Sequence, residues 1–264
     1  MKNFNNKTIW ITGASGGIGE ELAIQMAKEG AKIILTARNT EKLNTVKESL
    51  SGDGHVVYPM DLMNVDAIPN SAKEVLEKVG HVDMLINNAG ISQRSLVKDT
   101  LLEVDRRIME LDHFAAVALT KAVLPQMLER KSGHIVAISS VAGKIGTPMR
   151  SAYCAAKHAI IGFMDALRAE VHHDNIKVMV VTPGSVKTNI SINALEGDGK
   201  KHNVTDPMIA NGISVEECVK KIIKVIKRNT PELLIAKGTA KFGVYARRFY
   251  PKILFKAMTK LKTT

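Results

Sequence analysis

The chain has 264 residues, of which 45% are hydrophobic and 24% charged, so it carries enough apolar material for a sizeable core and is unlike a disordered segment. A single α/β domain, residues 1–264, can hold this length around one sheet. The formal net charge of +11 would favour a nucleic-acid partner only if the basic residues were spread along the chain. Instead, 13 Lys and Arg against one acid fall from Lys220 onward, so we expect no nucleic-acid partner.

The cysteines and the hydropathy pattern bear on the compartment. Cys154 and Cys218 are the only two cysteines, and they lack the spacing typical of metal ligands, which predicts a reducing compartment and no metal site. Residues 1–7 are too short and polar for a signal peptide, and no run of about 18 apolar residues occurs. We therefore expect a soluble, cytoplasmic protein.

Short apolar runs alternate with helical patterns from the start of the chain. Seven runs predict β-strands, at residues 8–12, 32–36, 55–58, 82–86, 134–139, 177–182 and 232–236. Most lack polar alternation, as expected for parallel strands covered on both faces. Helical periodicity separates them, for example at 20–28, 41–50 and 67–79. The alternation predicts an α/β, doubly wound Rossmann-type domain with a seven-stranded parallel sheet.

A glycine-rich turn follows the first predicted strand and precedes the first helix. It reads Thr12-Gly13-Ala14-Ser15-Gly16-Gly17-Ile18-Gly19. Glycine lets the backbone bend sharply and approach a pyrophosphate, and the helix N-terminus behind it supplies N–H donors. Glycine spacing alone also fits an ordinary turn, but the position between strand and helix favours a dinucleotide site. The candidate cofactor contacts here are Gly13, Ser15, Gly17, Ile18 and Gly19.

The end of the second strand distinguishes the two nicotinamide dinucleotides. An acidic side chain there accepts hydrogen bonds from the ribose 2′-hydroxyl of NAD and repels the 2′-phosphate of NADP. The strand ends Leu35-Thr36-Ala37-Arg38-Asn39, without a carboxylate, and Arg38 can form a charge-assisted fork with a phosphate. A solvated surface arginine is the alternative. The glycine turn upstream favours Arg38 as a ligand of NADP(H).

A serine, a tyrosine and a lysine follow the fifth predicted strand. Ser140 comes directly after it, and Tyr153 and Lys157 occupy positions i and i+4 of a helix, so both side chains lie on one face. A phenol ordinarily has a pKa of about 10, so proton transfer near neutral pH requires a positive charge beside it. We predict that Tyr153 exchanges a proton with a carbonyl or alcohol oxygen while hydride passes to or from the nicotinamide.

Further motifs complete a set that resembles the short-chain dehydrogenase/reductase family over nearly the whole chain. The set is Thr12-Gly-x-x-x-Gly-x-Gly, Asp61, Asn87-Asn88-Ala89-Gly90, Ser140, Tyr153-x-x-x-Lys157 and Pro183-Gly184, in the family's order. The resemblance implies that Ser140 binds the substrate oxygen and that Lys157 also holds the nicotinamide ribose. It implies a homo-dimer or homo-tetramer. It further implies cofactor contacts by Asp61, Leu62, Asn87, Ala89, Gly90, Tyr153, Lys157, Pro183, Gly184, Val186 and Thr188.

Other segments look like the branch of this family that contains dehydrogenase/reductase member 7B. They include Gly143-Lys144, Pro148-x-Arg150-Ser151-Ala152-Tyr153 and Thr188-Asn189-Ile190-Ser191. The branch argues against a carrier-bound 3-ketoacyl reductase, in which the basic tail would meet an acidic carrier protein. The intact Ser140, Tyr153 and Lys157 argue against a catalytically silent NADP(H)-binding sensor or scaffold. The small-molecule carbonyl or alcohol substrate stays open.

Asp112 departs from the family's pattern, because the family usually carries an asparagine there that holds a proton-relaying water. A carboxylate can accept a hydrogen bond from such a water but cannot donate one while ionised. We hypothesise that an ionised Asp112 near Lys157 keeps that lysine protonated and makes Asp112 a fourth catalytic residue. The alternatives are that burial raises the pKa of Asp112 itself, or that it only caps or pairs within its helix.

Two segments carry no motif of this set. Residues 184–212 form a long non-periodic stretch, predicted to cover a ligand, after which Ser214 and Glu217 match a helix-capping pattern. Residues 239–264 alternate aromatic and basic side chains and predict a basic amphipathic helix broken near Pro251. This segment could lie on an anionic membrane, bind an acidic partner or pack its apolar side on the domain, and we favour the packing.

Overall fold

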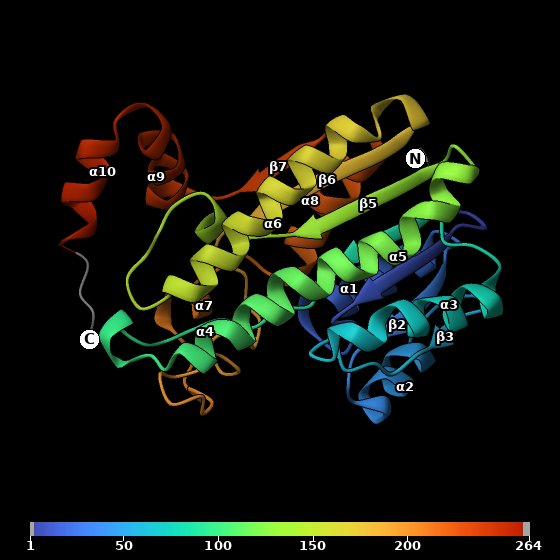
Figure 1. The fold of residues 1–264 in the computed structure, drawn as a ribbon, viewed down its shortest axis with the longest axis horizontal. Helices are drawn as coiled ribbons and strands as arrows, with labels where there is room; N and C mark the ends of the chain where they lie inside the picture. The colour runs from blue at the N-terminus through green and yellow to red at the C-terminus, as the bar shows by residue number, and fades with distance from the viewer. Residues whose placement is uncertain (1–2, 261–264) are drawn as a thin grey trace.

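The computed structural model describes residues 3–260 as a sheet with helices on both sides (Figure 1). Seven parallel strands hydrogen-bond in the order β3-β2-β1-β4-β5-β6-β7, which confirms the predicted fold class. The strands are β1 (Thr8–Thr12), β2 (Lys32–Thr36), β3 (Val56–Val57), β4 (Met84–Asn87), β5 (Gly133–Ile138), β6 (Ile176–Pro183) and β7 (Glu232–Ile235). The chain reverses its direction of travel across the sheet between β1 and β4, the position where nucleotides bind in such folds.

The helices connect successive strands and extend beyond the last one. They are α1 (Gly17–Lys28), α2 (Thr40–Glu48), α3 (Ile68–Val79), α4 (Leu102–Met109), α5 (Ala115–Glu129), α6 (Ser151–Glu170), α7 (Pro207–Ala210), α8 (Val215–Lys227), α9 (Gly238–Phe249) and α10 (Pro251–Met258). The tail is helical and broken at Pro251, as its pattern predicts, although residues 261–264 lie outside the described part. No helix within residues 3–260 combines the length and apolarity needed to span a bilayer.

Alternate residues of β1 face two separate apolar layers. Ile9 and Ile11 pack with α1, α2 and α8, whereas Trp10 packs with α3, α5 and α6. A strand covered on both faces has no polar alternation, which is why β1 is apolar at every central position. The indole Nε1 of Trp10 donates to Thr36 Oγ1 at 2.8 Å, so the polar atom of this buried ring is satisfied.

The ends of several predicted segments shift by one to three residues, and two differences have a visible cause or consequence. The third strand is only Val56–Val57, and it begins after His55 because the imidazole Nδ1 of His55, not a main-chain carbonyl, accepts the N–H of Ile33 at 3.1 Å. The loop 184–212 contains the short helix α7, so it is not wholly irregular. The predicted cap is confirmed, because Ser214 Oγ accepts the N–H of Glu217 at 3.1 Å and begins α8.

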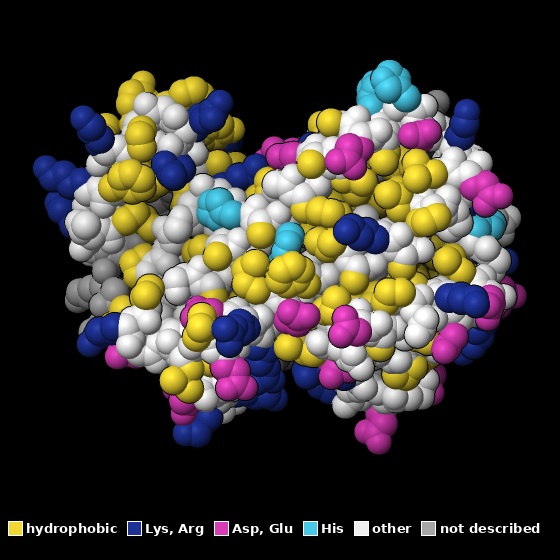
Figure 2. All heavy atoms as spheres, in the orientation of Figure 1, with side chains coloured by type: hydrophobic (Ala, Val, Ile, Leu, Met, Phe, Trp, Pro, Cys, Tyr) yellow, Lys and Arg dark blue, Asp and Glu magenta, His cyan; other side chains and the backbone are white. Residues whose placement is uncertain are grey.

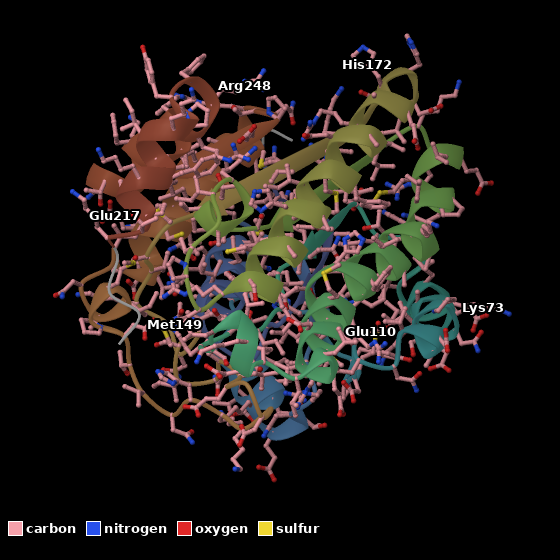
Figure 3. All side chains as sticks on the ribbon, turned by 60° about the vertical axis from the view of Figure 1, so that its left-hand side comes forward. Lys73, Glu110, Met149, His172, Glu217 and Arg248 are labelled. Carbon is pink, nitrogen blue, oxygen red and sulfur yellow. The ribbon has the colours of Figure 1, made fainter. Side chains whose placement is uncertain are left out.

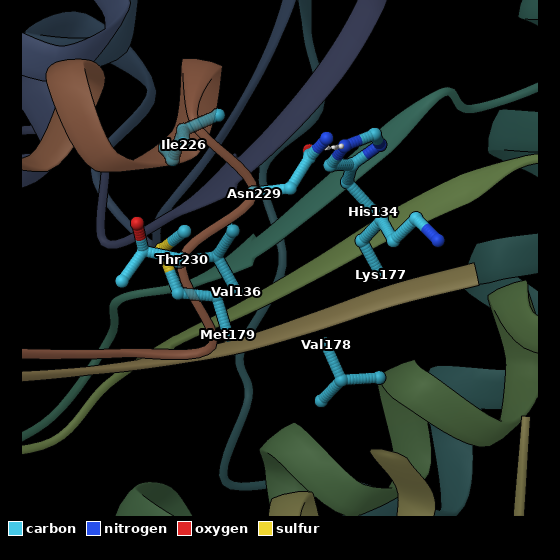
Figure 4. Close-up of a pocket in the computed structure, with 8 residues that line it drawn as sticks. All are labelled: His134, Val136, Lys177, Val178, Met179, Ile226, Asn229 and Thr230. Atoms are coloured by element: carbon cyan, nitrogen blue, oxygen red, sulfur yellow. Dashed lines mark hydrogen bonds between the residues drawn. The ribbon is translucent and has the colours of Figure 1, made fainter. Parts of the chain in front are cut away.

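A small pocket lies at the amino ends of β5 and β6 (Figure 4). In it, His134 Nε2 is 3.0 Å from Asn229 Oδ1. Burial lowers the pKa of His134 to about 4, so the imidazole is neutral at pH 7. The predicted functional residues gather instead at the carboxyl ends of the strands.

Candidate active site

The glycine turn after β1 is locked to the segment after β4. Thr12 Oγ1 accepts the N–H groups of Asn88 and Ala89, at 3.0 and 3.1 Å. The Asn88 side chain donates back to the carbonyl of Thr12 at 2.9 Å. These bonds hold the ends of two neighbouring strands at the position where the sheet order reverses.

The turn has the shape that a dinucleotide phosphate requires. Gly13 and Gly17 have φ angles of +65° and +58°, which favour glycine. A Cβ on Gly13 would lie 2.9 Å from the Cα of Ala89, and one on Gly17 would lie 3.2 Å from Cγ2 of Thr188. Helix α1 begins without a side-chain cap, which leaves its first N–H groups for an anion. The turn and the uncapped start of α1 therefore fit a pyrophosphate.

A second small pocket begins beside this turn. Its lining combines three residues predicted to contact the cofactor, Leu62, Asn87 and Ala89, with Thr12 of the glycine turn and four apolar residues that were not predicted to do so. The complete lining is Thr12, Leu62, Asn87, Ala89, Leu111, Ala115, Ala116 and Leu119. The Asn87 side chain points into the protein, where its Nδ2 donates to Thr120 Oγ1 at 3.0 Å. This apolar surface suits the adenine end of a dinucleotide.

The remaining predicted cofactor contacts lie around the same edge. Arg38 is exposed just beyond β2, and Asp61 is exposed beyond β3 with its carboxylate accepting the N–H of Met63 at 3.1 Å. Pro183 ends β6, and the N–H of Gly184 donates to Ile235 at 2.8 Å. Val186 is buried in the loop beyond them, with Thr188 nearby.

Ser140, Tyr153 and Lys157 come from the end of β5 and the first turns of α6. Ser140 follows β5, and its Oγ accepts the N–H of Ala142 at 3.1 Å. The buried Lys157 donates from Nζ to the carbonyl of Ile138, the last residue of β5, at 3.2 Å. The same Nζ lies 5.6 Å from the ring centroid of Tyr153. One ammonium thus connects the strand end to the face of the helix that carries the tyrosine.

Asp112 lies against Lys157 from a neighbouring helix. Its Oδ2 is 3.1 Å from Lys157 Nζ, and its Oδ1 accepts the N–H of Ile91 at 2.7 Å. Residues Glu110–Phe114 form a π-helical turn, a widening common at functional sites. A Cβ on Gly90 would lie 2.8 Å from Asp112 Oδ2 and 3.1 Å from Lys157 Nζ. Gly90 therefore leaves the space that this ion pair occupies.

Burial and charge act in opposite directions on the pair. Burial raises the pKa of Asp112, and the Lys157 ammonium and the Ile91 N–H lower it by less, so the net shift is upward. Burial lowers the pKa of Lys157, but the Asp112 carboxylate and Tyr153 raise it by more. Both shifts favour proton retention, so the pair holds at least one proton over a wide pH range.

A carboxylate from the loop 184–212 reaches two arginines beside the site, a feature that sequence reasoning missed. Asp206 Oδ2 accepts from Arg94 Nε at 2.8 Å and also contacts Arg94 Nη2. Arg150, three residues before Tyr153, donates to the same oxygen at 3.1 Å. The backbone of Leu195 adds bonds to Ser92 and Arg94, both at 2.8 Å. Nothing near Asp206 in the sequence signals these partners, because they lie on other elements.

Comparisons with known proteins agree with this geometry. Residues 7–199 match the model of the short chain dehydrogenase family. The chain is 42% identical over 259 residues to mouse dehydrogenase/reductase SDR family member 7B. The aligned region covers 96% of this chain and 80% of the mouse protein. It is similar to a short-chain dehydrogenase from Streptomyces avermitilis, with 28% identity, a TM-score of 0.83, and coverage of 97% and 96% of the two chains.

A solved structure of a short-chain dehydrogenase from Sphingobium yanoikuyae, in complex with NADPH, is also similar. It shares 26% identity and a TM-score of 0.77, with 97% of this chain and 96% of that chain covered. The family match, the identity to member 7B and the shared fold all point the same way. This chain therefore belongs to the short-chain dehydrogenase/reductase family of oxidoreductases, which bind nicotinamide cofactors, on the branch of member 7B.

Proposed function

We propose that the chain is an NADP(H)-dependent oxidoreductase that interconverts a carbonyl and a secondary alcohol on a small molecule. The observation that carries the proposal is the position of the Lys157 ammonium, which lies between the end of β5, the Tyr153 ring and Asp112. A buried positive charge in that position stabilises a phenolate. The glycine turn and the apolar pocket beside it support a dinucleotide at the same edge of the sheet.

In the direction of reduction, residues of the chain bind the substrate oxygen and protonate it. A bound nicotinamide supplies the hydride that adds to the carbonyl carbon. Ser140 Oγ donates a hydrogen bond to the carbonyl oxygen, and Tyr153 transfers its hydroxyl proton to that oxygen. Lys157 stabilises the phenolate that is left, and Asp112 keeps Lys157 protonated. In oxidation, the Tyr153 phenolate removes the alcohol proton.

The preference for NADP(H) rests on Arg38. It is exposed at the end of β2, and the strand end carries no carboxylate that would repel a 2′-phosphate. A charge-assisted bond is worth about 1.5–3 kcal/mol, so Arg38→Ala should lower kcat/KM for NADPH by about 10- to 100-fold. The value for NADH should change little. Equal losses with both cofactors would contradict the role of Arg38.

The first experiment is oxidation of NADPH and NADH over a panel of aldehydes, ketones, steroids and ketoacyl thioesters. Tyr153→Phe is the control, because it removes only the hydroxyl that transfers the proton. Turnover that prefers NADPH and disappears in the variant supports the proposal. Tight NADPH binding without turnover on any member favours a nucleotide-binding sensor or scaffold instead, and turnover on thioesters alone favours a ketoacyl reductase.

A further inference from the structure

The C-terminal hairpin, residues 238–258, packs on the domain with only part of its apolar surface. Ala246 of α9 and Leu254 of α10 form a buried cluster with Val141 and Ile145. The ring of Phe255 lies 5.1 Å from the Arg247 guanidinium and so braces the two helices against each other. The hairpin therefore packs beside the segment that follows Ser140, at one end of the molecule (Figure 1).

The outer surface of the hairpin is apolar and exposed. Half of the large hydrophobic side chains that are exposed in the described chain belong to it, although it forms only a small part of the sequence. They are Phe242, Tyr245, Phe249, Tyr250, Ile253 and Phe255, between 52% and 67% exposed. Contiguous exposed apolar surface of this kind marks an interaction site more often than a solvated surface. The packing that we favoured from the sequence thus accounts for only one side of the hairpin.

The exposed side chains of α9 form a stripe flanked by positive charge. Phe242, Tyr245 and Phe249 are spaced i, i+3 and i+7, which places them along one face of the helix. Lys241 and Arg248 lie on one flank of that stripe at the same helical period. Figure 3 shows side chains standing out around Arg248 at the edge of the molecule. An aromatic stripe beside basic side chains is typical of helices that lie in a membrane interface.

Charge favours an anionic occupant. Residues 238–260 contain six Lys and Arg and neither Asp nor Glu. Figure 2 shows hydrophobic and basic atoms interleaved at this end, whereas acidic side chains gather elsewhere on the same face. A nucleic-acid duplex would use the charge but not a stripe of outward phenylalanines, because its bases are not available to stack on them. A bilayer with anionic headgroups satisfies both features of the surface.

We infer that the C-terminal hairpin docks the protein peripherally on an anionic phospholipid bilayer. The aromatic stripe of α9 enters the headgroup boundary, and the flanking basic side chains bind lipid phosphate and carboxylate groups. The inner face of the hairpin contacts Val141 and Ile145, which follow Ser140 closely in the chain. Docking therefore places the carboxyl end of the sheet beside the membrane. The inference does not depend on the proposed reaction.

The test is co-sedimentation of the full chain with large vesicles. One set is pure phosphatidylcholine, and the other contains about one third phosphatidylserine. We expect binding to the anionic vesicles, little binding to the neutral ones, and release as salt is raised, because the attraction of exposed charges is screened. Absence of binding to anionic vesicles at low salt overturns the inference.

Two variants separate the features of the surface, with a matched control elsewhere. Phe242→Ser with Phe249→Ser removes the stripe, and Lys241→Glu with Arg248→Glu reverses the flank. Each should weaken vesicle binding at least about tenfold. Lys73→Glu with Lys78→Glu changes the net charge equally on α3, with Lys73 on the opposite side from Arg248 in Figure 3, and should bind like the wild type.

Folding and self-association are followed in the same samples. Thermal unfolding shows whether each variant is folded, and we expect only small losses of stability because the four substituted hairpin residues are exposed. Equal weakening by the control pair would show an effect of net charge alone and contradict the docking surface. Conversion of a dimer to a monomer in the serine variant, without a change in vesicle binding, would assign the stripe to a second copy of the chain.

Discussion

Two buried aspartates, Asp83 and Asp112, lie near opposite ends of β4 and face cations in different ways. Asp83 is approached by Arg130 at 2.8 Å and by Lys7 at 3.3 Å, whose side chains are 29% and 39% exposed. It also accepts the N–H of Thr8 at 3.0 Å. Asp112 has one cation, Lys157, at 3.1 Å, and that side chain is only 6% exposed. Asp112 is the more completely enclosed of the two, so both the depth of burial and the partners distinguish the two carboxylates.

The pKa values of the two groups move in opposite directions. Burial raises the pKa of Asp83, but the Thr8 N–H, Lys7 and Arg130 together lower it by more. At Asp112 the effect of burial is larger than that of its partners, and the pKa rises. Cations that keep part of their hydration can hold a carboxylate ionised, whereas a wholly buried pair pays desolvation on both sides. We interpret Asp83, Lys7 and Arg130 as a structural ion-pair cluster, and Asp112 as part of the proton transfer.

The largest expected effect comes from removing the cation of the buried pair. Lys157→Met takes the ammonium away from both Asp112 and Tyr153, and general acid–base catalysis is worth about 10²–10⁴-fold. We expect kcat/KM to fall by about 10³-fold once a substrate is known. Lys7→Met, which removes a lysine from Asp83, is the matched control and should leave kcat/KM within about twofold. Activity of Lys157→Met within tenfold of wild type would contradict the comparison.

The next largest expected effect is on the stability that the ion-pair cluster around Asp83 gives the folded protein. Asp83→Asn removes the charge that Arg130 and Lys7 approach and should lower the free energy of unfolding by about 1–3 kcal/mol at pH 7. Urea denaturation measures this loss, and activity per folded molecule should not change. A variant as stable as wild type at pH 7 would show that the ion-pair cluster around Asp83 contributes nothing to the free energy of unfolding.

The pH dependence of these stabilities has opposite signs. The lowered pKa of Asp83 gives stability that is present above the ordinary aspartate pKa and lost as the pH falls through the folded value, so Asp83→Asn should approach wild type in acid. The raised pKa of Asp112 gives stability that is present in acid and lost as the pH rises through the folded value. Asp112→Asn should therefore gain on wild type with rising pH. Parallel curves for the two variants would refute the contrast.

A third carboxylate, Asp206, extends the comparison to an ion pair outside the proton transfer. It binds Arg94 and Arg150 and so connects the loop 184–212 to the segments beside the site. Asp206→Asn keeps an acceptor but loses the charge that Arg94 and Arg150 share. On the prediction that the loop covers the substrate and takes no part in proton transfer, we expect KM for the substrate to rise about tenfold with kcat nearly unchanged. Limited proteolysis should also cut within 184–212 faster. A fall in kcat at constant KM would place Asp206 in the chemical step instead.

The smallest effect is on the pH–rate profile. The Asp112 carboxylate raises the pKa of Lys157, so Asp112→Asn should move the alkaline limb of the kcat/KM profile to lower pH. The maximal rate should change by less than about tenfold, because Asn can still bond the Ile91 N–H through its carbonyl. If both the rate and the profile match wild type, Asp112 has only a structural role.

Much of the fold and part of the site could be predicted from local patterns. Each predicted apolar run formed a strand, because a short run rich in β-branched residues between turn residues favours a strand covered on both faces over a buried helix. The glycine turn and the Tyr153 to Lys157 spacing were equally local, since a turn or a helix face is defined within a few residues. The short third strand was less predictable, because His55 takes a bond that the main chain would otherwise make.

The rest was decided by contacts between distant segments. Asp206 and Arg94 are separated by 112 positions, and Asp112 meets Lys157 only because a π-helical turn and the absence of a side chain at Gly90 make room. Periodicity showed that the tail is amphipathic but not which side would be covered. Local sequence determines how a segment bends and which faces are apolar, because those follow from backbone geometry. Which charges meet and which apolar faces stay exposed depends on how the segments pack, and only the tertiary structure of this chain decided that.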